Sequence, residues 1–152
     1  MLLRLAKRGG FMFRIRTNPA GSVGMNSNAD KKNLTRLLTE IVGGDAVLAD
    51  DRELVVYECD AYTLQKNLPT VVVLPGSAKE VAAVVRLCAE LDLPIIPRGA
   101  GTSLSGAVLA VDGGVMIALT RMNRVLAVDP RNRRALVEAG CVNAWITRDA
   151  EK

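Results

Sequence analysis

Residues 70–107 contain a short β-branched run, a helical pattern and a second short apolar run, and this order constrains the fold more than any other feature of the chain. The first run, TVVVL (70–74), is typical of a short buried strand. A helical pattern begins after Ser77 and extends to about Asp92. The run PIIP (94–97) follows directly and predicts a second strand. A strand, a helix and a strand in this order predict a βαβ unit with two parallel strands.

Other patterns fill in the expected architecture. Ser77 and Glu80 have the spacing of a capping box, which supports the start of the helix. The remaining expectations are an amphipathic helix in NLTRLLTEIV (33–42), irregular structure with one brief strand in residues 45–62, a strand in VMIAL (115–119), a hairpin formed by VLAV (125–128) and ALVEA (135–139), and a helix starting in VNAWITRDAEK (142–152). The expected fold class is α+β, or α/β, with a βαβ unit plus a β-hairpin.

The positive net charge belongs to one end of the chain. The formal net charge is +4 from 20 basic and 16 acidic residues. Five of the basic residues and none of the acidic ones precede Met25, so the remainder has 15 basic and 16 acidic residues. This distribution gives no basic surface pattern on the body of the chain, and we expect no nucleic-acid partner.

The basic N-terminal segment, residues 1–28, is expected to be a flexible arm, or upstream sequence of a protein that starts at Met25. Its composition is also that of a transit peptide, but Gly9 and Gly10 interrupt any amphipathic helix there. Residues 29–152 then form the folded portion. The apolar runs in the chain reach five residues, far short of the roughly 20 that a membrane-spanning helix needs, so we expect no transmembrane segment.

The chain has few of the residues that most often act in catalysis or metal binding. The three cysteines, Cys59, Cys88 and Cys141, are widely spaced and include no CxxC pair. They indicate neither a disulfide framework nor a zinc site, and they fit a reducing, cytoplasmic location. The chain has no histidine, which removes the commonest general base and catalytic-metal ligand. We therefore expect no metal and assign no catalytic residue.

The loop that leaves the second strand, PRGAGTSLSGA (97–107), is rich in glycine and small hydroxyl residues. It resembles two nucleotide motifs only in part. A Rossmann fingerprint needs a third glycine where the chain has Leu104 and a helix where the chain continues into AVLAVDGG (107–114). A Walker A loop needs lysine and a hydroxyl residue where the chain has Ala107 and Val108. Neither motif is complete.

Two interpretations of the loop remain on its residues alone. In one it is a plain surface loop, since glycine-rich loops are common. In the other, consecutive backbone N–H groups form an anion nest. Arg98 at the entrance would add positive charge, and the hydroxyls of Thr102, Ser103 and Ser105 would donate further hydrogen bonds. Such a site would suit a diphosphate that is bound and not cleaved.

The chain from about Tyr57 to Ala150 resembles a known family. The segments that carry the resemblance, in the family's order and spacing, are YECDAY (57–62), LPTVVVLPGSAKEVAAVVRLCAELDLPIIPRGAGTSLSGA (68–107), GGVMIALTRMNRVLAVDPRNRRALVEAGCVN (113–143) and AWITRDA (144–150). They are similar to the PCMH-type, vanillyl-alcohol oxidase-like FAD-binding domain of the glycolate oxidase D subunits and FAD-linked D-lactate dehydrogenases. The resemblance implies an incomplete domain of that type.

By this resemblance the loop binds the pyrophosphate of non-covalently held FAD. The residues it implies as cofactor-binding are Pro97, Arg98, Gly99, Ala100, Gly101, Thr102, Ser103, Leu104, Ser105 and Gly106. From the residues themselves, Leu104 could instead pack inward and Pro97 could simply end the strand. The family implies an oxidoreductase acting on a 2-hydroxy acid, glycolate or D-lactate, with flavin as the hydride acceptor.

Three hypotheses on the whole protein remain open. The chain is a fragment of the flavoenzyme, since the family's remaining flavin-domain segments and its substrate domain lie outside the resemblance. Alternatively, it is half of a split flavoenzyme that needs a separately encoded partner or other oxidase subunits. In the third, it is a standalone phosphate- or nucleotide-binding module without redox activity. In the fragment case we expect the chain alone to be inactive and to expose apolar surface around Trp145.

Overall fold

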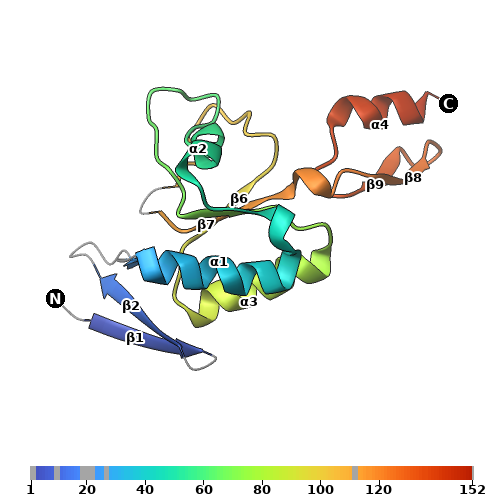
Figure 1. Ribbon diagram of the computed structural model, residues 1–152. Coiled ribbons are helices and arrows are strands. Elements are labelled where there is room, and N and C mark those ends of the chain that lie inside the picture. Colours follow the sequence, from blue (N-terminus) through green and yellow to red (C-terminus); the bar gives the residue numbers. More distant parts are fainter. Residues whose placement is uncertain (1–2, 9–10, 18–22, 26–27, 111–112, 152) are drawn as a thin grey trace.

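The computed structural model describes residues 3–8, 11–17, 23–25, 28–110 and 113–151 (Figure 1). The strands are β1 (Leu3–Arg8), β2 (Phe11–Thr17), β3 (Val23–Met25), β4 (Val47–Leu48), β5 (Val71–Val73), β6 (Ile95–Arg98), β7 (Val115–Ala118), β8 (Val125–Asp129) and β9 (Arg134–Val137). The helices are α1 (Asn28–Val42), α2 (Asp51–Leu54), α3 (Ala78–Glu90) and α4 (Asn143–Ala150), with 3-10 turns η1 (Gly44–Ala46), η2 (Val55–Tyr57) and η3 (Leu119–Arg121). The predicted mixture of helices and strands is confirmed.

The central sheet has the strand order β4-β5-β7-β6. Strands β5 and β6 both pair with β7 in parallel, so they are parallel to each other as predicted. They are not neighbours, however, because β7 lies between them. All four residues of β7 are buried, whereas β6 alternates between exposed and buried. A fully apolar strand takes the centre, where both faces are covered, and Pro97 suits the edge because it has no N–H to donate.

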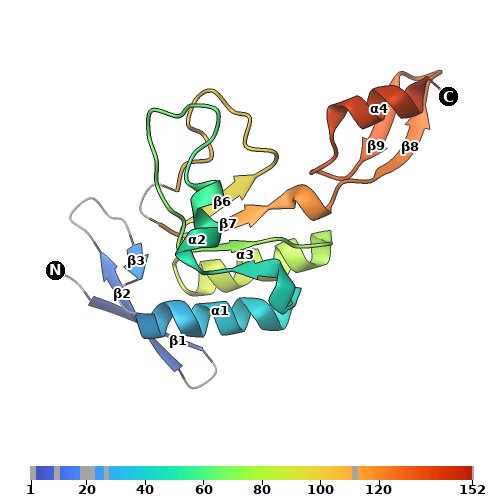
Figure 2. The same cartoon turned by 45° about the horizontal axis from the view of Figure 1, so that its top comes forward.

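The two faces of this sheet are covered differently. Helices α1 and α3 lie side by side against one face (Figures 1 and 2), where Leu34 and Leu38 pack with Val71, Val73 and residues of α3. The other face packs against α2 and a loop, and the side chains buried there are Leu54, Val72, Ile96, Ala110, Met116 and Ala118. The long loops that follow α2 and β6 lie on this second side.

Helix α3 begins as the sequence predicts. The hydroxyl of Ser77 accepts a hydrogen bond from the backbone N–H of Glu80 at 3.3 Å. The Glu80 carboxylate reaches back to the N–H of Gly76 at 2.8 Å, one residue before the usual partner in a capping box. The helix ends at Glu90, and Asp92 adopts a positive φ of 55° just after it. The chain then turns directly into β6.

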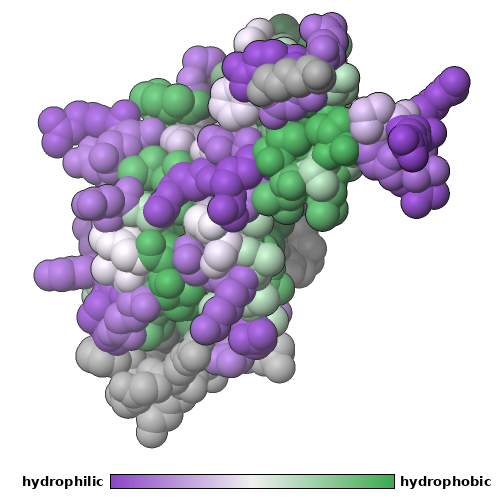
Figure 3. Space-filling model, turned by 90° about the vertical axis from the view of Figure 1, so that its right-hand side faces the viewer, coloured by the Kyte–Doolittle hydropathy of each residue, from purple (hydrophilic) through white to green (hydrophobic). Residues whose placement is uncertain are grey.

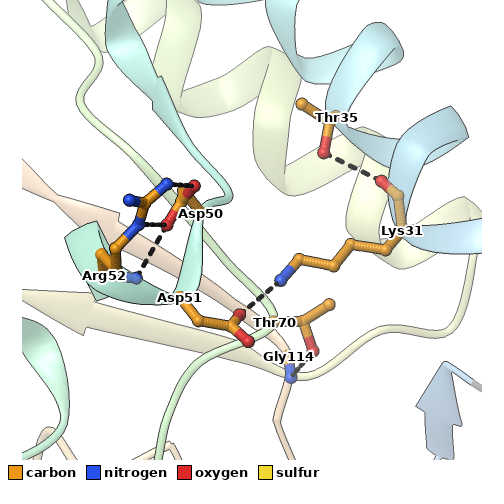
Figure 4. A network of polar contacts seen from close by, with 7 residues as sticks. All are labelled: Lys31, Thr35, Asp50, Asp51, Arg52, Thr70 and Gly114. Atoms are coloured by element: carbon orange, nitrogen blue, oxygen red, sulfur yellow. Dashed lines mark hydrogen bonds and ion pairs between the residues drawn. The ribbon is translucent and has the colours of Figure 1, made fainter. Parts of the chain in front are cut away.

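Helix α1 starts at Asn28, five residues before the predicted start, and ends as predicted before Gly43, whose φ is 87°. Its added first turns are tied to α2 by an ion pair between Lys31 Nζ and Asp51 Oδ1 at 3.1 Å (Figure 4). In the same view the Thr35 hydroxyl donates to the Lys31 carbonyl at 2.8 Å. This contact to a distant segment is not visible in a local apolar pattern.

The segment from residue 45 to 62 contains the brief strand that was predicted, β4, which pairs antiparallel with β5. The expectation of otherwise irregular structure was wrong for residues 51–57, which form α2 and η2. The reason is a local cap: the Asp50 carboxylate accepts a hydrogen bond from the Arg52 N–H at 2.9 Å.

Residues 123–151 form what we call the hairpin–helix unit. Strands β8 and β9 pair antiparallel, as predicted, and α4 follows them. Figure 2 shows the unit projecting from the body of the molecule. None of its residues is buried, and large apolar side chains lie exposed on it, namely Leu126, Leu136, Val142 and Trp145. Figure 3, which faces this side, shows hydrophobic surface among the hydrophilic residues.

Strands β1, β2 and β3 form a separate antiparallel sheet in the N-terminal segment. That this segment is a flexible arm stays a prediction, as does the boundary at residue 28. Gly9 and Gly10 lie outside the described residues. In the part of the chain that the structure describes, no helix is long and apolar enough to cross a membrane.

Candidate cofactor-binding site

The candidate site lies at the carboxyl edge of the central sheet. Because β5, β6 and β7 run in the same direction, the segments that leave their carboxyl ends meet at one edge. In open α/β sheets this edge is the usual place for ligands. The loop that follows β6, residues 99–106, is therefore in the position that a ligand-binding loop occupies in such folds.

The loop presents its backbone to solvent. Within the described residues, the backbone N–H groups from Ala100 to Leu104 donate no hydrogen bond to a protein acceptor. Gly101 and Gly106 have φ values of 72° and 70°, in the left-handed region that favours glycine. A run of free N–H groups on a backbone with few side chains is the arrangement that accommodates an anion. The geometry therefore fits the diphosphate of a nucleotide cofactor.

Arg98 lies behind this loop and not at its entrance, where we expected it. Arg98 is 9% exposed, and its Nη1 donates a hydrogen bond to the carbonyl of Cys59 at 2.8 Å. The guanidinium carbon lies 5.5 Å from the centre of the Tyr57 ring. A Cβ added to Gly101 would come within 2.2 Å of Arg98 Nη2. Arg98 therefore supports the loop from its inner side and fixes it to the segment 57–59.

The other predicted loop residues are brought together, with different surroundings. Leu104 is 78% exposed, so it does not pack inward. Pro97 lies inside β6, opposite Ile117, and the strand continues for one more residue. The hydroxyls of Ser103 and Ser105 lie 3.0 Å apart and share a hydrogen bond. Binding by these residues remains a prediction.

The segment 57–67, which we call the wall, lies beside the loop. It is closed at its base by Asn67, whose N–H donates to the Glu58 carbonyl at 2.8 Å, and by a 2.5 Å ion pair between Lys66 and Glu58. The hydrogen bond with Glu58 raises the pKa of Lys66. A Cβ added to Gly106 would lie 3.7 Å from the Tyr62 ring. The wall and the loop thus contact each other.

Asp60, in this wall, is a buried polar residue that sequence reasoning missed. It is 5% exposed, and its Oδ1 accepts a hydrogen bond from the Tyr62 N–H at 2.8 Å. Its Oδ2 is buried and finds no hydrogen-bond partner among the described residues. An aspartate in an acid-rich stretch gives no sequence signal of burial. The pattern Asp-x-Tyr was visible, but the packing that covers Asp60 was not.

The described residues contain no group of three or more histidine, cysteine, aspartate or glutamate side chains able to hold a metal ion. The three cysteines are free, and burial raises the pKa of the Cys88 thiol to about 12. The cytoplasmic location that the cysteines suggested stays a prediction.

The chain matches a family model described as an FAD binding domain over residues 69–152, which is more than half of its length. The glycolate oxidase subunit GlcD of Escherichia coli (strain K12) is 36% identical over 121 residues, covering 80% of this chain and 24% of that protein. The D-lactate dehydrogenase of Anaerostipes hadrus is 44% identical over 87 residues, covering 57% of this chain and 18% of that protein. The chain thus spans a quarter or less of these relatives.

Solved structures support the same fold. The crystal structure of p-cresol methylhydroxylase with substrate bound superimposes with a TM-score of 0.72 at 23% identity, covering 82% of this chain and 25% of that one. The predicted PCMH-type fold is confirmed, and the cofactor of the family is FAD. The chain belongs to the FAD-binding domain family and corresponds to part of the FAD-binding domain of oxidoreductases of the GlcD glycolate oxidase and D-lactate dehydrogenase type.

Proposed function

We propose that this chain holds the diphosphate of FAD in the loop Pro97–Gly106 and serves as the first part of the flavin domain of a 2-hydroxy-acid oxidoreductase. The observation that carries the proposal is the run of N–H groups from Ala100 to Leu104, at the carboxyl edge of the parallel strands, that find no acceptor among the described residues. Phosphate oxygens accept hydrogen bonds from such a run without any need for a cationic side chain. The binding residues are those predicted from Pro97 to Gly106.

Arg98 acts in this proposal as the support of the loop. Its bond to the Cys59 carbonyl and its position under Gly101 fix the backbone that faces the phosphates. Its positive charge, although turned inward, still favours an anion on the other side of a thin loop. The loop is therefore ordered before the ligand arrives, which reduces the entropy lost on binding.

The chemistry of the reaction comes from the cofactor, which accepts the hydride of the substrate when bound. This chain's residues bind one end of it and orient it against the sheet edge. No described residue is assigned as the base that takes the hydroxyl proton. The chain alone is therefore proposed to bind FAD without oxidising substrate. Its substrate class, glycolate or D-lactate, is proposed from the names of the two relatives.

A second observation favours further polypeptide that completes the flavin domain. The hairpin–helix unit has no buried residue, and a two-stranded sheet is marginally stable in water without a packed face. Leu136 is 63% exposed and Trp145 is 38% exposed on this unit. We propose that further polypeptide of the same flavin domain, in the same chain or supplied as a separate subunit, covers these side chains.

The test is the absorbance spectrum of the purified chain with added FAD, followed by size-exclusion chromatography. Flavin absorbance that elutes with the protein, and that pyrophosphate or ADP displaces, supports binding through the diphosphate. Binding of pyrophosphate and ADP without any retention of FAD would favour the standalone phosphate-binding module. Absence of binding by all of them would overturn the proposal for this chain.

A matched pair of variants tests the loop itself. Gly101→Ala forces a side chain onto a φ of 72° and into the Arg98 guanidinium, so FAD affinity should fall by about tenfold or more. Gly44→Ala is the control, because Gly44 has ordinary φ and an added Cβ meets its nearest atom at 3.9 Å. Equal FAD affinity in both variants would show that the loop does not bind FAD.

A further inference from the structure

Asp60 carries the strongest unexplained feature of the described chain, and the inference drawn from it rests on the proposed function. One carboxylate oxygen, Oδ1, is engaged by the N–H of Tyr62 at 2.8 Å. The other, Oδ2, is buried without a partner among the described residues. Buried polar atoms in folded proteins nearly always have a hydrogen-bond partner, and an exception needs a cause such as a missing ligand.

Asp60 lies in the wall, the segment 57–67, at the part that contacts the loop. The residue before it, Cys59, accepts a hydrogen bond from Arg98 through its carbonyl oxygen. Two residues after it, the ring of Tyr62 faces Gly106 at the other end of the loop. These two contacts place the segment 59–62 directly beside the loop. An orphan oxygen next to the loop is therefore a candidate contact for the same ligand.

The chemistry of the orphan atom selects what it can bind. An ionised carboxylate only accepts hydrogen bonds, so its partner must be a hydroxyl or an N–H group. A phosphate has neither and would be repelled by the negative charge. The phosphates of a ligand therefore belong with the N–H run of the loop, and the partner of Asp60 must be a different part of the ligand.

We propose that Asp60 is a ligand-binding residue whose Oδ2 accepts a hydrogen bond from a hydroxyl or amino group of the bound nucleotide. The site thus takes a diphosphate attached to a sugar or sugar alcohol, and discriminates it from free pyrophosphate. Because Oδ2 is shielded from solvent, the side chains that cover it must move for the ligand to reach it. The donor belongs either to the adenosine half of the ligand or to the riboflavin half.

The test is the Asp60→Asn variant, titrated calorimetrically with FAD, ADP, FMN and pyrophosphate. Asparagine keeps an oxygen for the Tyr62 N–H and turns the orphan atom into a donor, which opposes a donor on the ligand. FAD affinity should fall by about tenfold or more, the usual range for a hydrogen bond to a charged group, with pyrophosphate affinity within about twofold of wild type. A matching loss for ADP or for FMN identifies the half that holds the donor.

Two controls make the result decisive. Asp45→Asn makes the same change on an exposed carboxylate and should leave all affinities unchanged. Without ligand, Asp60→Asn should unfold close to the wild-type temperature, because one unpartnered buried polar atom replaces another. A lower unfolding temperature, with FAD and pyrophosphate weakened equally, would make Asp60 a structural residue and overturn the inference.

The outcomes also separate this inference from the proposed function. If the wild-type chain binds FAD and Asp60→Asn binds it equally well, the role of Asp60 is refuted while the loop proposal survives. If the wild-type chain binds none of the four probes, the proposed function fails and the inference fails with it.

Discussion

Gly140 approaches the backbone of Leu119 so closely that a Cβ added to it would lie 1.9 Å from the Leu119 carbonyl oxygen. The Gly140 N–H also donates to the Met122 carbonyl at 2.8 Å. This contact joins the end of the hairpin to η3, at the point where the chain leaves the central sheet. The hairpin–helix unit is thus attached to the body through backbone atoms where no side chain fits.

Gly140→Ala should therefore disturb the attachment of the hairpin–helix unit. The two backbones must separate by more than 1 Å, which breaks the bond to Met122. Limited proteolysis should cut residues 123–151 faster in the variant, while the sheet core remains protected. Gly44→Ala serves as the control, and equal cleavage of the two variants would contradict the prediction.

Arg98→Lys should weaken FAD binding even though it keeps the positive charge. Lysine lacks the planar fork that reaches the Cys59 carbonyl while lying over Tyr57 and under Gly101. We expect a loss of roughly tenfold in FAD affinity, measured by quenching of flavin fluorescence. Unchanged affinity would mean that the charge of Arg98 and not its position supports the loop. Arg86→Lys, on the exposed side of α3, provides the comparison.

The buried thiol of Cys88 should make stability depend on alkaline pH. Burial raises its pKa from 9.0 to about 12, so the unfolded chain loses this proton before the folded chain does. Stability is then unaffected below pH 9 and falls from about pH 9 upward, by at most about 1.4 kcal/mol per pH unit. Urea unfolding between pH 8 and 10.5 measures this slope. Cys88→Ala should reduce it, and an identical slope in both proteins would refute the assignment.

The exposed apolar side chains of the hairpin–helix unit should bind a hydrophobic dye. Leu136 and Leu126 are 63% and 51% exposed, so Leu136→Glu should lower the fluorescence of bound anilinonaphthalene sulfonate. Leu64→Glu, an exposed leucine outside the unit, tests whether the effect is local. A wild-type chain that is monodisperse and does not bind the dye would argue against an uncovered interface.

The parts of the fold that local patterns encode were predictable from the sequence. The Ser77 cap, the strands in TVVVL and VMIAL and the hairpin all depend on residues close together in the chain. The early start of α1 was not predictable from apolar periodicity, because its first five residues, NADKK (28–32), are polar apart from Ala29. The position of β7 between β5 and β6 was not predictable either. Strands β5 and β7 are both fully apolar and buried, so the pattern of neither strand shows which one lies between the others.

The site shows the same division. The glycine loop was predictable because its glycine and small hydroxyl residues lie next to each other in the sequence. The family resemblance then indicated the cofactor. The inward position of Arg98 and the burial of Asp60 depend on how the segment 57–62 packs on the loop. The hydrophobic pattern of the sequence does not predict how two irregular segments pack against each other.

The central position of β7 also determines when the sheet can form during synthesis. Strands β5 and β6 make no direct ladder with each other, and both pair with β7, which follows them by at least 17 residues (from Arg98 to Val115). Until Ala118 has left the ribosome, the β5–α3–β6 segment therefore exposes unpaired strand edges. The nascent chain must pass through this interval before its parallel sheet closes, and chaperone contact during translation is expected to concentrate there.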